Sequence, residues 1–263
     1  MDIDKIKELI KIGVQNGQYP QFVYKYRTTI IDKKPNKYFD SIISDNSMMF
    51  SSPKAFNDPF DCQLQPVTFP SPADVTTFLN NVLPGAPTSV IANLATNAIS
   101  NPLAFAQILE NAIKFDDKGV LCLSQEPDNI LLWSHYSDNH YGVCLKFDIL
   151  QDLDFFSIPL HCIYDTNYPI YNHMTNSGKI VDMMIKTKFK PWDYEKEIRI
   201  FKQANGLYHF NKQALTEIIF GCNTPQVEID RIKNLASANG YGHLTFKQTE
   251  KQTGTYGLTL KPA

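Results

Sequence analysis

Strand-length apolar runs and helical segments follow one another irregularly along this chain of 263 residues. Residues 119–124 and 142–147 are apolar runs typical of buried strands, whereas 3–15 carries apolar side chains at helical spacing. Without regular β-α-β alternation, this order favours an α+β fold, with a twisted, largely antiparallel sheet and flanking helices, over a doubly wound one. We expect further strands at 22–27, 48–53, 156–164, 196–202, 216–220 and 243–247, and further helices at 36–45, 130–136, 175–188 and 225–238.

Residues 72–115 differ from the rest of the chain in composition. They are rich in Ala, Asn, Leu and Ile, hold few charges, and are interrupted by Pro84, Pro87 and Pro102. We therefore expect two or three helices inserted within a single α+β domain that spans residues 1–263. The insertion is either a lid or small helical subdomain, or a set of ordinary packing helices, and the sequence does not choose between them.

The charge balance and the cysteines narrow the functional classes. The chain has 25 basic and 27 acidic side chains, a formal net charge of −2. A protein that mainly coats nucleic acid needs a basic footprint, so this class is disfavoured. Five widely spaced cysteines without a CxxC pair argue against structural zinc and indicate a reducing compartment. No signal peptide or membrane-length apolar run is evident, so we expect a cytoplasmic protein without a membrane partner.

Two cations and two tyrosines alternate in the expected strand at 22–27. Lys25 and Arg27 fall on one face, and Tyr24 and Tyr26 fall on the other. A pair of cations on one strand face suits a phosphate or a carboxylate. The alternative is an amphipathic strand whose polar face lies in water.

A stretch rich in Ser, Asn, Asp and Pro follows the expected strand at 48–53. Ser51 and Ser52 begin it, and Asn57 and Asp58 lie further along, just before Pro59. Such a stretch forms a rigid polar loop, because Asn and Asp bond their own backbone and Pro blocks a helix. The loop either presents ligand contacts or is a structural turn.

Polar side chains also mark the end of the strand at 119–124 and the helix after it. Ser124 ends a buried strand but has no base beside it in sequence, so ligand contact or strand termination is favoured over a nucleophilic role. Trp133 and Tyr136 share a helix face, where they pack in the core or stack on a ligand ring. His135 and His140 are candidates as a pair of general bases or as metal ligands, although no third ligand is evident.

The segment from Trp192 to Ile200 concentrates ionisable residues. If it forms a strand, three of them share one face: Glu195, Glu197 and Arg199. Three ionisable groups on one face are not a core pattern. On an exposed face they are simply solvated, whereas in a cleft Arg199 holds one carboxylate ionised and leaves the second for catalysis.

The chain resembles a bacterial family catalogued as domain-of-unknown-function 2971. The resemblance runs from about residue 22 to 222 and rests on the following stretches, in this order: YKYR, FSSPKAFNDPFDC, GVLCLSQEPDNILLWSHYSDNHYGVCLKFD, WDYEKEIRI and EIIFG. That family is remotely similar to ADP-ribosyltransferases, which grip NAD in a split β-sheet. Those enzymes carry His or Arg on the first strand, Ser or Tyr on a later strand, and Glu near the end.

The resemblance implies positions for these groups in the present chain. They are Lys25 or Arg27 on the first strand, Ser124 on a later one, and Glu195 or Glu197, whose spacing resembles the paired-Glu motif of the transferring subgroups. It implies an enzyme that consumes NAD as a transferase or glycohydrolase, in the setting of a toxin or phage-defence effector. Its acceptor is a protein, a nucleic acid or a small molecule.

The implied catalytic residues are Glu197, which stabilises the ribose cation, and Glu195, which positions the acceptor. The implied NAD-binding residues are Lys25, Tyr26, Arg27, Ser51, Ser52, Asn57, Asp58, Ser124, Trp133, Tyr136, His140 and Arg199. One alternative is a non-catalytic nucleotide- or nucleic-acid-binding module. Another is a metal-dependent hydrolase, although the spacing of its candidate ligands fits no standard site. These candidate ligands are Asp58, Asp61, His135, His140 and Glu197.

Overall fold

The computed structural model describes residues 3–62, 65–66, 71–105, 116–171 and 179–263, which form two compact units. The first unit consists of Met1–Ser51, Gly119–Cys162 and Pro191–Ala263, and the second consists of Ser52–Lys118 and Ile163–Lys190. Each unit is therefore built from segments that are far apart in the sequence. No described helix is long and apolar enough to span a membrane.

An eight-stranded sheet organises the first unit, in the order β16-β15-β14-β7-β1-β6-β12-β8. Its strands are β1 (Phe22–Arg27), β6 (Gly119–Ser124), β7 (Val143–Asp148), β8 (Leu160–His161), β12 (Glu197–Lys202), β14 (Leu215–Phe220), β15 (Thr245–Lys251) and β16 (Leu258–Pro262). Neighbouring strands are antiparallel except β14 and β15, which run parallel. The expected α+β fold with a largely antiparallel sheet is confirmed.

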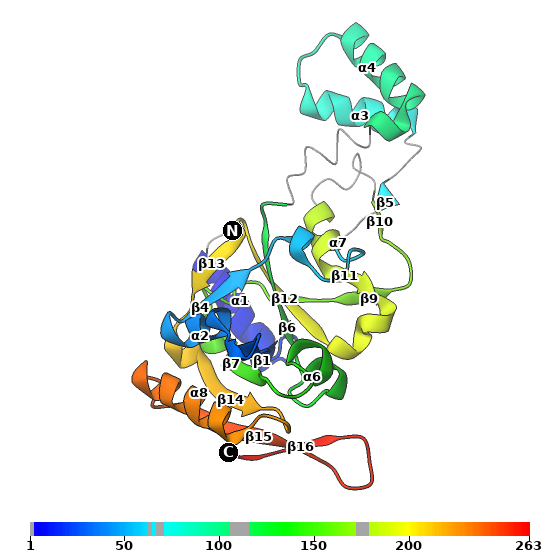
Figure 1. Cartoon of the computed structure of the whole chain (residues 1–263). Coiled ribbons are helices and arrows are strands. Elements are labelled where there is room, and N and C mark those ends of the chain that lie inside the picture. The colour runs from blue at the N-terminus through cyan, green and yellow to red at the C-terminus, as the bar shows by residue number, and fades with distance from the viewer. Residues whose placement is uncertain (1–2, 63–64, 67–70, 106–115, 172–178) are drawn as a thin grey trace. The chain divides into compact units, whose positions relative to one another are not determined.

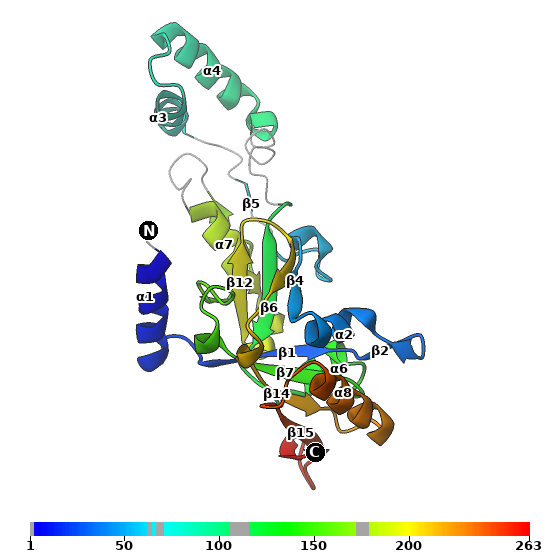
Figure 2. The ribbon, with the colours of Figure 1, turned by 90° about the vertical axis from the view of Figure 1, so that its left-hand side faces the viewer.

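The sheet is nearly divided between β1 and β6. These two strands share one paired position, Tyr24 with Ser124, whereas β1 pairs with β7 and β6 pairs with β12 at six positions each. Figure 2 shows β6 and β12 running at a steep angle to β1, β7 and β14. Beyond Tyr24, β1 therefore leaves β6, and among the described strands the segment Lys25–Arg27 pairs with β7 alone.

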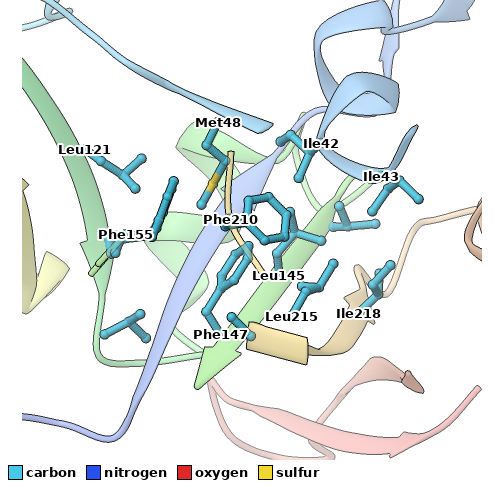
Figure 3. Packing of buried hydrophobic residues seen from close by; sticks show 14 of the residues in the cluster. Ile42, Ile43, Met48, Leu121, Leu145, Phe147, Phe155, Phe210, Leu215 and Ile218 are labelled. Carbon is cyan, nitrogen blue, oxygen red and sulfur yellow. The ribbon is translucent and has the colours of Figure 1, made fainter. Parts of the chain in front are cut away.

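The larger core of this unit lies on the sheet face that receives alternate apolar residues, and Figure 3 shows part of it. Leu121, Leu145 and Leu215 from three strands pack there with Phe147 and Phe210, whose rings meet edge to face at 5.3 Å. Each fully buried side chain of this size contributes roughly 1.5–3 kcal/mol to folding. Helices α1 (Ile3–Gln15), α2 (Lys37–Ser44) and α8 (Gln226–Ala238) add apolar residues to this core.

Helix α6 (Ile130–Tyr136) packs beside β1 and contributes to a smaller core. Asn129 caps the helix by accepting bonds from the backbone N–H groups of Leu131 and Leu132, at 3.0 and 3.2 Å. The buried members of this core are Tyr26, Leu132, Trp133, Cys144, Ile219 and Leu258. The cap fixes where α6 begins, and therefore where its polar side chains lie along β1.

Smaller elements complete the first unit (Figure 1). Strand β4 (Ser47–Phe50) pairs with β13 (Gly206–His209), and β2 (Ile30–Ile31) pairs with β3 (Lys34–Pro35). Short 3-10 helices lie at η2 (Ile149–Gln151) and η5 (Lys212–Ala214), and η4 (Lys190–Glu195) leads into β12. This last turn brings Glu195 to the start of β12.

The second unit has its own small helical core. Helices α3 (Pro72–Val82) and α4 (Thr88–Ser100) bury Val75, Leu79 and Ile91 against one another. Its other elements are η1 (Pro53–Ala55), β5 (Gln65–Pro66), β9 (Ile163–Asp165), β10 (Ile170–Tyr171), α7 (Ile180–Lys186) and β11 (Thr187–Phe189). Strand β5 pairs with β10 and β9 pairs with β11, both in parallel. The inserted helices expected at 72–115 are confirmed over 72–100, and residues 106–115 lie outside the described residues.

Two predicted elements differ from the structure. The expected strand at 156–164 is largely wrong, because Phe155 and Phe156 lie in a turn where their rings fill the core, and β8 and β9 are only short strands. Phe155 and Phe156 are apolar because their rings are buried in the core, and not because they pair in a strand. The expected helix at 175–188 ends at Lys186, where β11 begins, and residues 172–178 are not described.

Candidate active site

Two cations stand on β1 beyond the point where it leaves β6. The Lys25 Nζ donates a 2.6 Å hydrogen bond to the Cys122 carbonyl of β6, and Arg27 lies two residues further along the same strand. Both side chains are partly exposed, and within the described part of the chain neither forms an ion pair with a carboxylate. Burial lowers the pKa of Lys25 to about 8, with the charge of Arg27 as a second cause, and burial also lowers the pKa of Arg27.

A buried ion pair occupies β12. Arg199 Nε donates to Glu197 Oε1 at 2.9 Å, and Arg199 donates a second bond to Glu197 Oε2 at 3.1 Å. The two side chains are 0% and 3% exposed, so the pair is shielded from water. Ile198 and Ile200 alternate with them and pack in the larger core. The expected alternation of Glu197 and Arg199 with Ile198 and Ile200 is therefore confirmed, and Arg199 binds both oxygens of Glu197.

Glu195 does not belong to β12, contrary to the expectation that it shares a strand face with Glu197. It ends the 3-10 helix η4, and Lys196 separates it from the strand by adopting a φ of 45°. The Tyr136 hydroxyl donates a 2.7 Å hydrogen bond to Glu195 Oε1, and the Ser124 hydroxyl donates to the Glu195 carbonyl at 2.8 Å. Glu195 is thus positioned by α6 and by the end of β6.

The cations and the two carboxylates lie within electrostatic range of one another. The register places Glu197 beside Ser124, which pairs with Tyr24, so Glu197 lies on the tyrosine face of β1. Even so, Glu197 and Glu195 both act to raise the pKa of Lys25, more weakly than burial acts to lower it. The divergence of β1 from β6 therefore brings the two sets of charges near each other from opposite faces of the sheet.

Tyr26 and Trp133 are too buried to offer a ring face to a ligand. Their rings meet edge to face at 5.2 Å, with exposures of 5% and 0%. The Tyr26 hydroxyl donates to the Glu126 carbonyl at 2.6 Å, and the Trp133 ring N–H donates to the Pro127 carbonyl at 2.8 Å. Burial raises the pKa of Tyr26. Of the two roles that the sequence left open for Trp133, the structure therefore favours packing, which holds α6 against β1, over stacking on a ligand.

His140 contacts Trp133 and not the charged groups. Its ring stacks on the Trp133 indole with centroids 6.1 Å apart, and its Nε2 lies 3.3 Å from the Ser134 hydroxyl. Its backbone φ of 71° is unusual for a residue other than glycine. Burial, with the charge of Lys251 as a second cause, lowers the pKa of His140 and favours the neutral ring. The described residues hold no group of three His, Cys, Asp or Glu side chains placed for a metal ion.

The remaining predicted contacts, Ser51, Ser52, Asn57 and Asp58, follow β4 in the sequence. Ser51 pairs with Val120 in the first unit through backbone hydrogen bonds, whereas Ser52, Asn57 and Asp58 belong to the second unit. The Ser52 hydroxyl accepts from the Lys54 backbone at 3.3 Å, Asp58 accepts from the Phe60 backbone at 2.9 Å, and the Asn57 side chain is exposed. Ser52 and Asp58 therefore act as caps of a short turn.

Cys122 and the rings beside Glu195 were not assigned a role from the sequence. Cys122 looks like a core residue in an apolar run, yet it is partly exposed, and its thiol interacts electrostatically with both Lys25 and Arg27. Trp192 and Tyr194 stand next to His135 of α6. The signal for them was the spacing Trp-x-Tyr-Glu, which places two rings immediately before the carboxylate.

Comparison with known proteins gives one family. No curated protein and no solved structure was found to match the chain. Residues 132–200 match the family model described as "Protein of unknown function (DUF2971)". The matched segment contains Trp133, Tyr136, Glu195, Glu197 and Arg199, and thus both carboxylates of the candidate site and the groups that hold them. The resemblance found in the sequence is confirmed over residues 132–200, which match this family of unknown function.

Proposed function

We propose that this protein binds NAD where β1 leaves β6, and that it transfers or hydrolyses the ADP-ribose part. The observation that carries the proposal is the pair of cations Lys25 and Arg27, which have no carboxylate partner among the described side chains. The carboxylates of Glu195 and Glu197 are near enough to act electrostatically on Lys25. Cations that are partly buried without a counter-charge carry a desolvation cost that a bound anion offsets. The pyrophosphate of NAD supplies such an anion.

The carboxylates suit the bond-breaking step. When the bond between ribose and nicotinamide breaks, the nicotinamide leaves as a neutral molecule with the bonding electrons, and the ribose carbon becomes cationic. Glu197, whose two oxygens are bonded by Arg199, supplies the negative charge that stabilises that cation electrostatically. Glu195, held by Tyr136, orients the water or acceptor hydroxyl that attacks the ribose carbon.

The test is the release of nicotinamide by the purified protein, with and without cell extract as a source of acceptors. We expect release by the wild type and a loss of at least about a hundredfold in Glu197→Gln, the scale for removing an electrostatic group aimed at a transition-state charge. The matched control is Glu250→Gln, an exposed carboxylate on β15. Failure of the wild type to release nicotinamide, with and without extract, rules out the reaction.

A nucleotide-binding module without catalysis is the second candidate. The observation that favours it is the bidentate Arg199–Glu197 pair, because a carboxylate with both oxygens bonded to one guanidinium has little freedom to meet a substrate. Equilibrium binding of NAD separates the two candidates. The binding module is favoured if NAD binding is saturable and no nicotinamide is released. Arg27→Met should then weaken the binding, whereas Lys5→Met, an exposed control on α1, should leave it unchanged.

A further inference from the structure

The second unit contains a cavity of about 240 Å³, and the described residues that line it all belong to that unit. The lining is mostly apolar and includes three aromatic side chains, Phe60, Tyr168 and Phe189, together with Pro169. The aromatic side chains are 40% to 65% exposed, so the cavity is open to solvent. An enclosed cavity of about 150 Å³ holds a benzene molecule, so this one has room for a small organic group.

Asp165 lines the same cavity as the aromatic side chains. Strands β9 and β11 pair in parallel (Figure 1), and their register places Asp165 opposite Phe189, so both side chains project from one face of this small sheet. Asp165 Oδ1 accepts a 2.9 Å hydrogen bond from the Asn167 backbone N–H, in a turn that leads to Tyr168. The Asp165 carboxylate forms no ion pair with a described side chain, so its negative charge stays uncompensated beside the rings.

Lys188 is the other charged residue among the described residues that line the cavity. It lies between Thr187 and Phe189 on β11, so alternation along the strand directs its side chain to the face opposite to that of Phe189. Its ammonium group forms an ion pair with the buried Asp61, at 3.8 Å, and Asp61 is not one of the lining residues. The charge of Lys188 is therefore balanced by Asp61, which leaves the negative charge of Asp165 to attract a ligand.

We propose that this cavity binds a trimethylammonium group, with its methyl groups against the rings and its charge near Asp165. Aromatic faces attract a cation that lies within about 6 Å of the ring centre, and methylated ammonium groups are the usual ligands of such aromatic cages. A primary ammonium is strongly hydrated and loses more on entering an apolar cavity, whereas Asp165 repels an anion. The proposal is independent of the proposed reaction, whose residues belong to the first unit.

Calorimetric titration of the full chain with choline tests the proposal. The matched ligand is the neutral alcohol in which a carbon atom replaces the choline nitrogen, because it has the same shape and no charge. We expect choline to bind at least about fivefold more tightly than this alcohol, which is the scale of a cation–aromatic contact. A short peptide with one trimethylated lysine is the third titrant. Its affinity relative to that of choline shows whether the trimethylammonium group comes from a modified protein or from a small molecule.

Two variants assign the binding to the cavity. Asp165→Asn keeps an oxygen that accepts from Asn167 and removes the charge, and Phe189→Leu keeps an apolar side chain and removes the ring. Each should weaken choline binding about two- to fivefold, and Asp165→Asn should leave binding of the neutral alcohol unchanged. The control is Asp182→Asn on α7, an exposed carboxylate of the same unit that pairs with Lys186 and does not line the cavity. It should leave choline binding unchanged.

Three outcomes overturn the proposal. The first is that neither choline nor the trimethyl-lysine peptide shows saturable binding up to about 10 mM, a concentration that detects even weak complexes. The second is that choline and the neutral alcohol bind equally, which makes the cavity a simple apolar site. The third is that choline binding is unchanged in both Asp165→Asn and Phe189→Leu, which places the bound choline elsewhere. Circular dichroism checks that the variants are folded, and the comparison of choline with the alcohol needs the wild type alone.

Discussion

Strands β12 and β1 both carry charged side chains at alternate positions, but the charges are paired with each other on β12 and are not paired on β1. On β12, Arg199 and Glu197 neutralise each other through two hydrogen bonds and are almost inaccessible to water. On β1, Lys25 bonds a backbone carbonyl, and neither Lys25 nor Arg27 has a carboxylate partner in the described structure. The strands differ because β12 pairs with β6 along its whole length, whereas β1 leaves β6 after one position.

The contrast separates a structural charge from an available one. Two opposite charges that satisfy each other in a dry site fix a local geometry, and removing one leaves the other uncompensated. Two like charges that remain partly hydrated cost some stability and keep the capacity to bind an anion. The same chain therefore uses arginine for support on one strand and, by our proposal, for recognition on another.

The largest expected effect follows from breaking the pair on β12. Arg199→Met removes the guanidinium that bonds both oxygens of the buried Glu197 and should lower the free energy of unfolding by about 3–5 kcal/mol. Chemical denaturation measures it. The double variant Arg199→Met/Glu197→Leu removes both charges and should be less destabilised than the single variant. A double variant as unstable as the single one would falsify the view that the uncompensated charge causes the loss.

Arg27→Met should act in the opposite sense on stability. Removing a cation without a counter-charge should leave the free energy of unfolding unchanged or raise it, and should weaken binding of NAD or pyrophosphate by about ten- to a hundredfold, the range of one charge-assisted hydrogen bond. Calorimetric titration measures the affinity. A fall in stability comparable to that of Arg199→Met would show that the contrast between the strands is wrong.

Tyr136→Phe tests whether Glu195 is positioned by α6. The variant keeps the ring and removes the hydroxyl that donates to Glu195 Oε1 at 2.7 Å, so we expect a loss of about 1–2 kcal/mol in the free energy of unfolding. Nicotinamide release should fall while NAD affinity is kept, because the carboxylate loses its orientation and the cations are untouched. Equal loss of release and of affinity contradicts a positioning role.

The pH dependence of anion binding should reveal Lys25. Its pKa of about 8 means that the ammonium group is charged below that pH and neutral above it. Affinity for pyrophosphate should therefore decrease, by up to about tenfold, from one unit below to one unit above that pKa. Between about 8 and the ordinary value of 10.5 the unfolded chain holds this proton more tightly, so stability rises with pH there. In Lys25→Met the step in affinity should disappear.

The smallest effect is expected in the second unit. Asp58→Ala removes the cap on the Phe60 backbone and should cost roughly 0.5–1 kcal/mol, with no change in anion affinity. A large loss of anion affinity would instead show that Asp58 takes part in anion binding.

The sequence predicted what depends on local periodicity. Alternation along β12 separates Glu197 and Arg199 from Ile198 and Ile200, and the helical spacing of apolar residues at 3–15 predicts α1. Glu195 was misplaced because the break at Lys196 is a left-handed turn in a residue that does not signal one. The divergence of β1 from β6 is a matter of register between distant segments, which no local pattern encodes.

The position of β1 within the sheet also has a consequence for synthesis. Its six-position partner β7 extends to Asp148, and the second unit's segment Ser52–Lys118 is made between the two. During translation β1 therefore stays unpaired until that long segment and then β7 have left the ribosome. The delay costs little at equilibrium, because loop-closure entropy grows only with the logarithm of loop length. The delay affects the kinetics of folding, because Phe22–Arg27 has no strand beside it during that interval.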